Sequence, residues 1–109
     1  MRTPQVSVAP GLERAAHQLA EANGNADPAV SVVYWVPAPD EIRLVVVDST
    51  VAPEPAGERL APFYFGADPV GGIDYRSAII LISPEDDQHA PLPPEWGSWN
   101  AARPIWRRS

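Results

Sequence analysis

The run Ala-Ile-Ile-Leu-Ile-Ser at residues 78–83 is the feature that most constrains how this chain can fold. A half-buried strand alternates apolar and polar residues, whereas an unbroken apolar run indicates burial on both faces. We therefore expect this segment to be a central strand in a sheet that is covered on both sides. Because the chain has 109 residues, a single domain, residues 1–109, must supply both the sheet and its covers.

Three further segments predict strands. Residues 30–36 and 42–48 have strand-like patterns and flank the turn sequence Pro-Ala-Pro-Asp-Glu, so they predict a hairpin with a five-residue loop. Residues 60–65 predict another strand, in which Pro62 favours an edge position or an irregular start. The expectation is a small antiparallel sheet of three to four strands over residues 30–83.

Residues 10–23 predict a helix that follows a short lead-in at residues 1–9. Pro10 suits a helix start, and Asn23-Gly24 suits a helix end. One face carries small or apolar residues at helical spacing, which lets the helix lie close to a sheet: Leu12, Ala15, Ala16, Leu19 and Asn23. The predicted fold class is therefore α+β, with one N-terminal helix packed on the sheet.

The C-terminal part of the chain predicts little regular structure. Residues 84–90 form a short helical turn, because Ser83 can cap it and Pro84 suits its first position. Residues 91–109 are an irregular tail rich in Pro, Trp and Arg. Because Trp and Arg are favoured in binding hot spots, this tail is either a strap over the sheet or a site for another molecule.

The second face of the sheet also needs a cover. If the helix covers the face of Val32, Tyr34, Leu44 and Val46, the other face exposes more apolar surface than monomers usually do. That face would carry Val33, Trp35, Val45 and Val47, with Phe63 or Phe65. The tail, a second copy in a homodimer or a different protein could cover it. The candidate protein-binding residues are Trp35, Val45, Val47, Trp96, Trp99 and Trp106.

Charge and composition exclude several classes of partner. Residues 1–95 hold all 14 acidic residues and five of the eight arginines, a net charge of −9, which argues against nucleic-acid binding. No apolar run is long enough to span a membrane, and no signal peptide is visible. The absence of cysteine favours a reducing cytoplasm. Arginine as the only basic residue type, together with abundant alanine, suggests a GC-rich prokaryotic genome.

No residue pattern predicts a catalytic or metal centre. The histidines, His17 and His89, lie near acidic residues in sequence, but solvated helix surfaces explain both arrangements. Asp68 and Asp74 flank a Gly-Gly pair without the spacing of an EF-hand, and that pair lacks the lysine of a phosphate loop. We therefore predict no metal and no cofactor.

The sequence thus favours a small non-enzymatic protein-binding or regulatory module of prokaryotic type. Its acidic body would suit a basic target through electrostatic steering. The alternative is a small hydrolase or isomerase whose site assembles from loops around Asp74, Tyr75, Arg76 and His89. A third reading, mimicry of nucleic acid, would need acidic residues arrayed along one face, whereas here they are scattered through turns.

Overall fold

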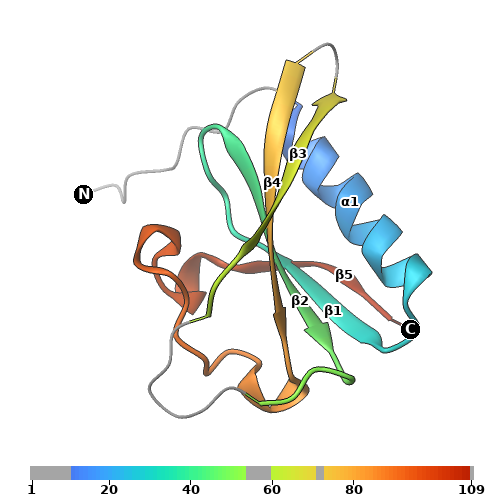
Figure 1. Cartoon of the computed structure of the whole chain (residues 1–109), viewed down its shortest axis with the longest axis vertical. Helices are drawn as coiled ribbons and strands as arrows, with labels where there is room; N and C mark the ends of the chain where they lie inside the picture. The colour runs from blue at the N-terminus through green and yellow to red at the C-terminus, as the bar shows by residue number, and fades with distance from the viewer. Residues whose placement is uncertain (1–10, 54–59, 71–72, 109) are drawn as a thin grey trace.

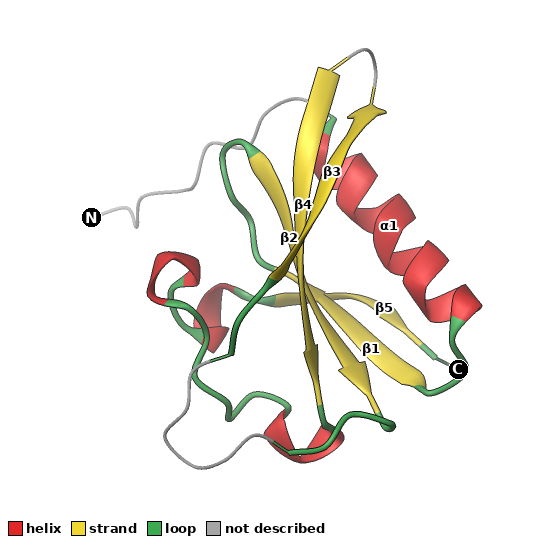
Figure 2. Cartoon of the chain, viewed as in Figure 1, coloured by secondary structure: helices red, strands yellow, loops and turns green. Residues whose placement is uncertain are grey.

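The computed structural model describes residues 11–53, 60–70 and 73–108, and the side chains of residues 65–70 and 73–75 are outside this description. One helix lies on one side of a five-stranded sheet, and the C-terminal segment lies on the other (Figures 1 and 2). The elements are α1 (Leu12–Ala26), β1 (Val30–Trp35), β2 (Glu41–Asp48), β3 (Phe63–Val70), β4 (Ile73–Ile82), the 3-10 turns η1 (Pro84–Asp86), η2 (Pro94–Trp96) and η3 (Trp99–Ala101), and β5 (Arg103–Arg107). The predicted α+β class and the N-terminal helix packed on a sheet are confirmed.

The helix begins and ends later than its pattern predicts. Gly11 precedes it with φ of 82°, a left-handed conformation that suits glycine and cannot be part of the helix. Gly24 does not stop the helix, which continues to Ala26. Its missing side chain serves packing instead, because a Cβ there would lie 2.3 Å from a ring atom of Trp106. Gly24 is therefore a site of close approach between α1 and β5, not a C-terminal cap.

The sheet has the order β3-β4-β2-β1-β5, which corrects the expected antiparallel arrangement of three to four strands. β4 pairs with β2 in parallel, and the other three pairings are antiparallel. The apolar run of β4 explains this order. Because Ala78, Ile80 and Ile82 must be buried on one face and Ile79 on the other, β4 takes the inner place beside β2 and leaves the edge to β3.

The tail is not wholly irregular, because Arg103–Arg107 forms the edge strand β5 against β1. A proline is tolerated there, since an edge strand has one side without ladder hydrogen bonds. The turn expected at 84–90 is present as η1, and the hydroxyl of Ser83 accepts a hydrogen bond from the backbone N–H of Glu85 at 3.1 Å.

The expected assignment of faces was wrong for β1. Val33 lies opposite Val46 and Trp35 opposite Leu44, so these four residues share the face under α1. Val32 and Tyr34 lie on the other face. A one-residue difference in register exchanges the faces of a whole strand, and the turn that sets this register cannot be read from alternation alone.

The second face is covered by the chain itself. Side chains from three strands form its core together with Leu60 and the segment 90–102, which we call the strap. From the strap, Ala90, Leu92 and Trp96 are buried, and the indole of Trp99 donates a hydrogen bond of 2.7 Å to the carbonyl of Ala90. The ring of Trp99 also meets that of Tyr34 edge-on, with centroids 5.3 Å apart. The two sheet faces are thus sealed by different ends of the chain.

Replacing Gly24 with alanine should destabilise the protein. On an isolated helix this change is stabilising by about 1 kcal/mol, whereas an added Cβ against Trp106 should cost about 1–3 kcal/mol through overpacking. Urea unfolding of Gly24→Ala measures the sign. Unchanged or raised stability would contradict the close approach, and Gly24→Ala combined with Trp106→Leu should recover part of the loss.

Trp96→Ala should destabilise the isolated protein by about 3–5 kcal/mol, because Trp96 is buried between the strap and the sheet. Asn100→Ala is the matched control, since Asn100 is exposed on the same strap. Urea unfolding of both variants makes the comparison. If the strap were a docking site for another molecule and not a cover, Trp96→Ala would leave the stability of the isolated protein unchanged.

Candidate functional site

The six predicted binding residues all pack within the protein's own core or against it. Trp35 lies in the core under α1, while Val45, Val47 and Trp96 lie in the core under the strap, each 3% exposed or less. The partly buried side chains Trp99 and Trp106 pack against these two cores from the strap and from β5. The structure therefore divides this set between two faces and gives each member an internal contact.

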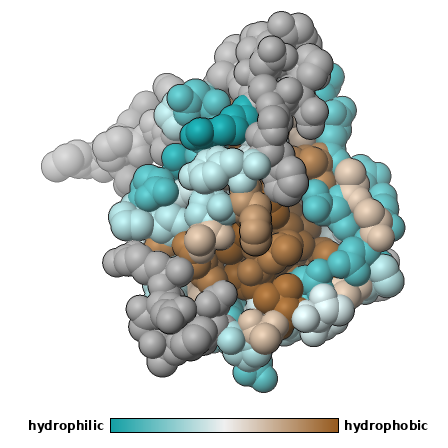
Figure 3. Space-filling view, viewed as in Figure 1, coloured by the Kyte–Doolittle hydropathy of each residue, from teal (hydrophilic) through white to brown (hydrophobic). Residues whose placement is uncertain are grey.

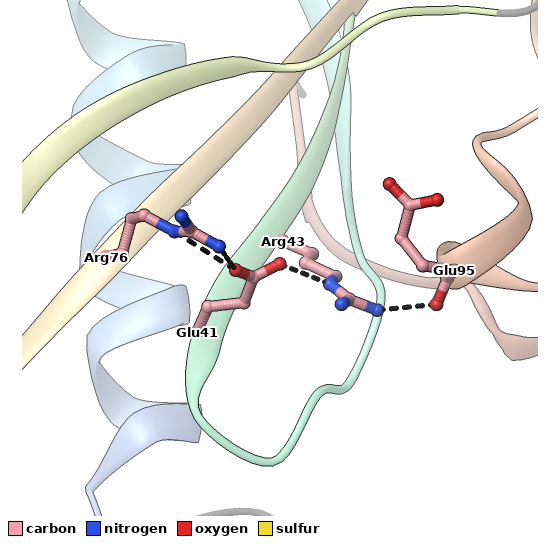
Figure 4. Close-up of polar contacts among 4 residues, drawn as sticks. All are labelled: Glu41, Arg43, Arg76 and Glu95. Carbon is pink, nitrogen blue, oxygen red and sulfur yellow. Dashed lines mark hydrogen bonds and ion pairs between the residues drawn. The ribbon is translucent and has the colours of Figure 1, made fainter.

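A polar cluster closes one end of the strap-side face. Glu41 is only 5% exposed and stands between two arginines (Figure 4). Its Oε2 accepts a hydrogen bond of 2.6 Å from Nε of Arg43, and its Oε1 accepts one of 2.7 Å from Arg76. Arg43 also donates to the backbone carbonyl of Glu95 at 2.8 Å, so the cluster ties β2 and β4 to the strap.

Aromatic rings flank both arginines of this cluster. The guanidinium of Arg43 lies 5.7 Å from the ring centroid of Trp96, and that of Arg76 lies 4.6 Å from that of Tyr64. Burial opposes ionisation of Glu41, but its hydrogen bonds and charge interactions with the two arginines outweigh this effect. The pKa of Glu41 is therefore lowered from its ordinary value, and the group is an ionised anchor.

The cluster does not assemble the alternative enzyme site. Of the four residues proposed for that site, Arg76 is bound to Glu41, and the side chains of Asp74 and Tyr75 lie outside the described residues. His89 follows the far end of β4, and the strand between Arg76 and Ile82 is about 20 Å long at ~3.3 Å per residue. His89 and His17 are both exposed. A buried, doubly paired carboxylate of this kind suits a structural tie between elements.

Within the described residues, no group of three acidic or histidine side chains could hold a metal ion. The side chains of Asp68 and Asp74 are outside that search. None of the described helices is long and apolar enough to cross a bilayer.

The exposed apolar residues gather elsewhere, at the β3 side of the sheet. α1 packs on β1, β2 and β5, which leaves the β3–β4 half of that face without a helix above it. Phe63 lies opposite Ile79 on this half, and Leu81 follows two positions along β4. Phe63 is 60% exposed and Leu81 39% exposed. We call Phe63, Ile79 and Leu81 the β3–β4 surface, and Figure 3 shows hydrophobic residues gathered at the centre of the view beside α1.

Sequence reasoning missed this surface for a specific reason. Phe63 was grouped with the second face, and the apolar run 78–83 predicted burial on both sides of its strand. That burial is real for Ala78, Ile79 and Ile80, but Leu81 escapes it because one helix covers only part of a five-stranded sheet. Pro62 did give a usable signal, since it marked the following strand as an edge.

Comparison with known protein families, with curated proteins and with solved structures found no match for this chain.

Replacing Glu41 with glutamine should lower stability at neutral pH by about 2 kcal/mol, because it removes charge-assisted hydrogen bonds to two arginines. A carboxyl whose pKa is lowered by folding stabilises the protein above its unfolded pKa of about 4.3, and this contribution is lost as the pH falls through the folded pKa. Urea unfolding of wild type and Glu41→Gln at pH 7 and pH 3 tests this. A difference that does not shrink at pH 3 would contradict an ionised Glu41.

Proposed function

We propose that this protein is a small non-enzymatic binding module that docks a protein partner on the β3–β4 surface. One observation carries the proposal: Phe63 and Leu81 are 60% and 39% exposed on a sheet face whose remaining apolar residues are buried under α1. Large apolar side chains in a contiguous exposed patch are typical of interaction sites. The proposal keeps the expected class of function and moves the docking site away from the tryptophan residues.

The two edges of the sheet support this choice of surface. β5 is short, carries Arg103, Pro104 and Arg107, and has an irregular register against β1. Charged residues, proline and bulges are the usual means by which proteins prevent pairing at an edge strand. β3 has such features only in its later part, around Asp68 and Pro69, where its register also shifts. Its opening residues, Phe63–Phe65, are aromatic and have none of these features.

The polar surroundings of the β3–β4 surface support a protein partner over a charged small molecule. On the opposite face of β3, the cation of Arg76 is neutralised by Glu41 and stacked on Tyr64. An aromatic and aliphatic centre with a paired charge at its rim has the composition of a protein interface. A cytoplasmic location is part of this proposal, because a chain of this size without cysteine suits a reducing compartment.

A photo-crosslinking amino acid placed at position 63 in the native host tests the proposal. Position 63 should give a discrete protein adduct, because it lies in the exposed part of the β3–β4 surface. The same probe at position 100, exposed on the strap, is the matched control and should give none. The position 63 adduct should also disappear in a Leu81→Asp background. Equal labelling at both positions, or an adduct that survives Leu81→Asp, would contradict docking at this surface.

A further inference from the structure

We infer that the occupant of the β3–β4 surface is a second copy of this chain, in a reversible symmetric dimer. The inference rests on the proposed function, since it names the partner for the same surface. The two copies pack their β3–β4 surfaces face to face, so that Phe63 and Leu81 of each copy lie against those of the other. The β3 edge of each copy then lies beside α1 of the other.

The shape of the molecule suits this arrangement. α1 covers one half of its sheet face and stands above it as a step, and the β3–β4 half lies beside that step (Figure 1). A helix is about 10 Å thick, and packed sheets lie about 10 Å apart. A second copy turned through 180° can therefore lay its own β3–β4 half on the first while its β3 edge fits beside the helix. The same step and flat surface on each copy make the contact self-complementary, as a two-fold interface requires.

The opposite arrangement, with α1 of one copy laid on the β3–β4 surface of the other, does not fit. The outer side of α1 is polar and includes Glu13, Arg14, His17, Gln18 and Glu21, all exposed. Laying these groups on Phe63 and Leu81 would take charges out of water without partners, which is costly. The apolar surface of one copy is thus matched by the apolar surface of the other and not by its helix.

The small area of the surface decides the strength of the dimer. Two strands are about 10 Å wide, and the eight residues of β3 extend about 26 Å, so the footprint is near 260 Å² per copy. Stable complexes bury about 800 Å² per partner. The contact of β3 with α1 adds area, but the dimer remains in the weak class. We therefore expect a dissociation constant of roughly 100 µM, well above that of a permanent dimer.

Charge gives the dimer a signature of its own. Each copy carries a net charge of −6, so two copies repel each other while their apolar surfaces attract. Salt screens the repulsion and leaves the apolar contact in place. Association should therefore strengthen as salt is raised, whereas a dimer held by ion pairs would weaken.

Sedimentation velocity of the full chain, from about 10 µM to about 1 mM and at low and high salt, tests the inference. The expected result is a monomer–dimer equilibrium that tightens with salt. Phe63→Asp and, separately, Leu81→Gln should each weaken it at least about tenfold, because both side chains lie at the contact. Asn100→Asp adds the same charge on the strap and should leave it unchanged. Circular dichroism confirms that each variant is folded.

Two outcomes would overturn the inference. One is a wild-type chain that stays monomeric throughout this range at both salt concentrations. The other is a dimer that persists unchanged in both Phe63→Asp and Leu81→Gln. A monomeric chain that still gives a position 63 adduct with a different protein would reject the second copy and leave the proposed function standing, whereas loss of that adduct specificity would reject the proposed function itself.

Discussion

The fold depends on burial of the central strands from both sides. Leu44, Val45, Val46 and Val47 are consecutive in β2, point alternately to the two faces, and are each 1% exposed or less. Hydrophobic burial on one face alone would leave half of this strand in water, so the sheet needs two separate covers. A chain of this size supplies them economically, with α1 before the sheet and the strap after it. Neither cover can be removed without exposing half of the core.

The two ends of the chain are also tied to each other. Arg108 follows β5 and donates hydrogen bonds to the carbonyls of Gly24 at 2.6 Å, Asp27 at 3.0 Å and Val30 at 2.9 Å. The last turn of α1 holds no basic residue of its own, so Arg108 supplies a positive charge at the negative end of the helix dipole. Its guanidinium lies 5.2 Å from the ring centroid of Trp106, which packs on Gly24. The C-terminal strand thus fixes where the helix lies on the sheet.

Local patterns predicted the local structure, and non-local pairings were beyond them. The helix, the β1–β2 hairpin and the Ser83 cap follow from periodicity, turn residues and capping chemistry within a few residues of each other. The parallel pairing of β4 with β2 and the recruitment of Arg103–Arg107 as β5 depend on which segments compete for the inner positions of the sheet. The faces of β1 depended on a register that alternation does not determine. The tryptophan residues attracted attention as binding residues because hot-spot composition and core composition are alike.

The position of the uncovered surface follows from the same competition. With β5 recruited beside β1, α1 settles over β5, β1 and β2, where Trp106 and Arg108 hold its C-terminal end. One helix is about two strands wide, so the remaining two strands, β4 and β3, keep one face in water. Polar residues could have occupied that face at no cost to the core, yet Phe63 and Leu81 stand there. Nothing in the packing of the monomer requires large apolar side chains at these two positions, and this is why contact with another molecule is the physical reason we assign to them.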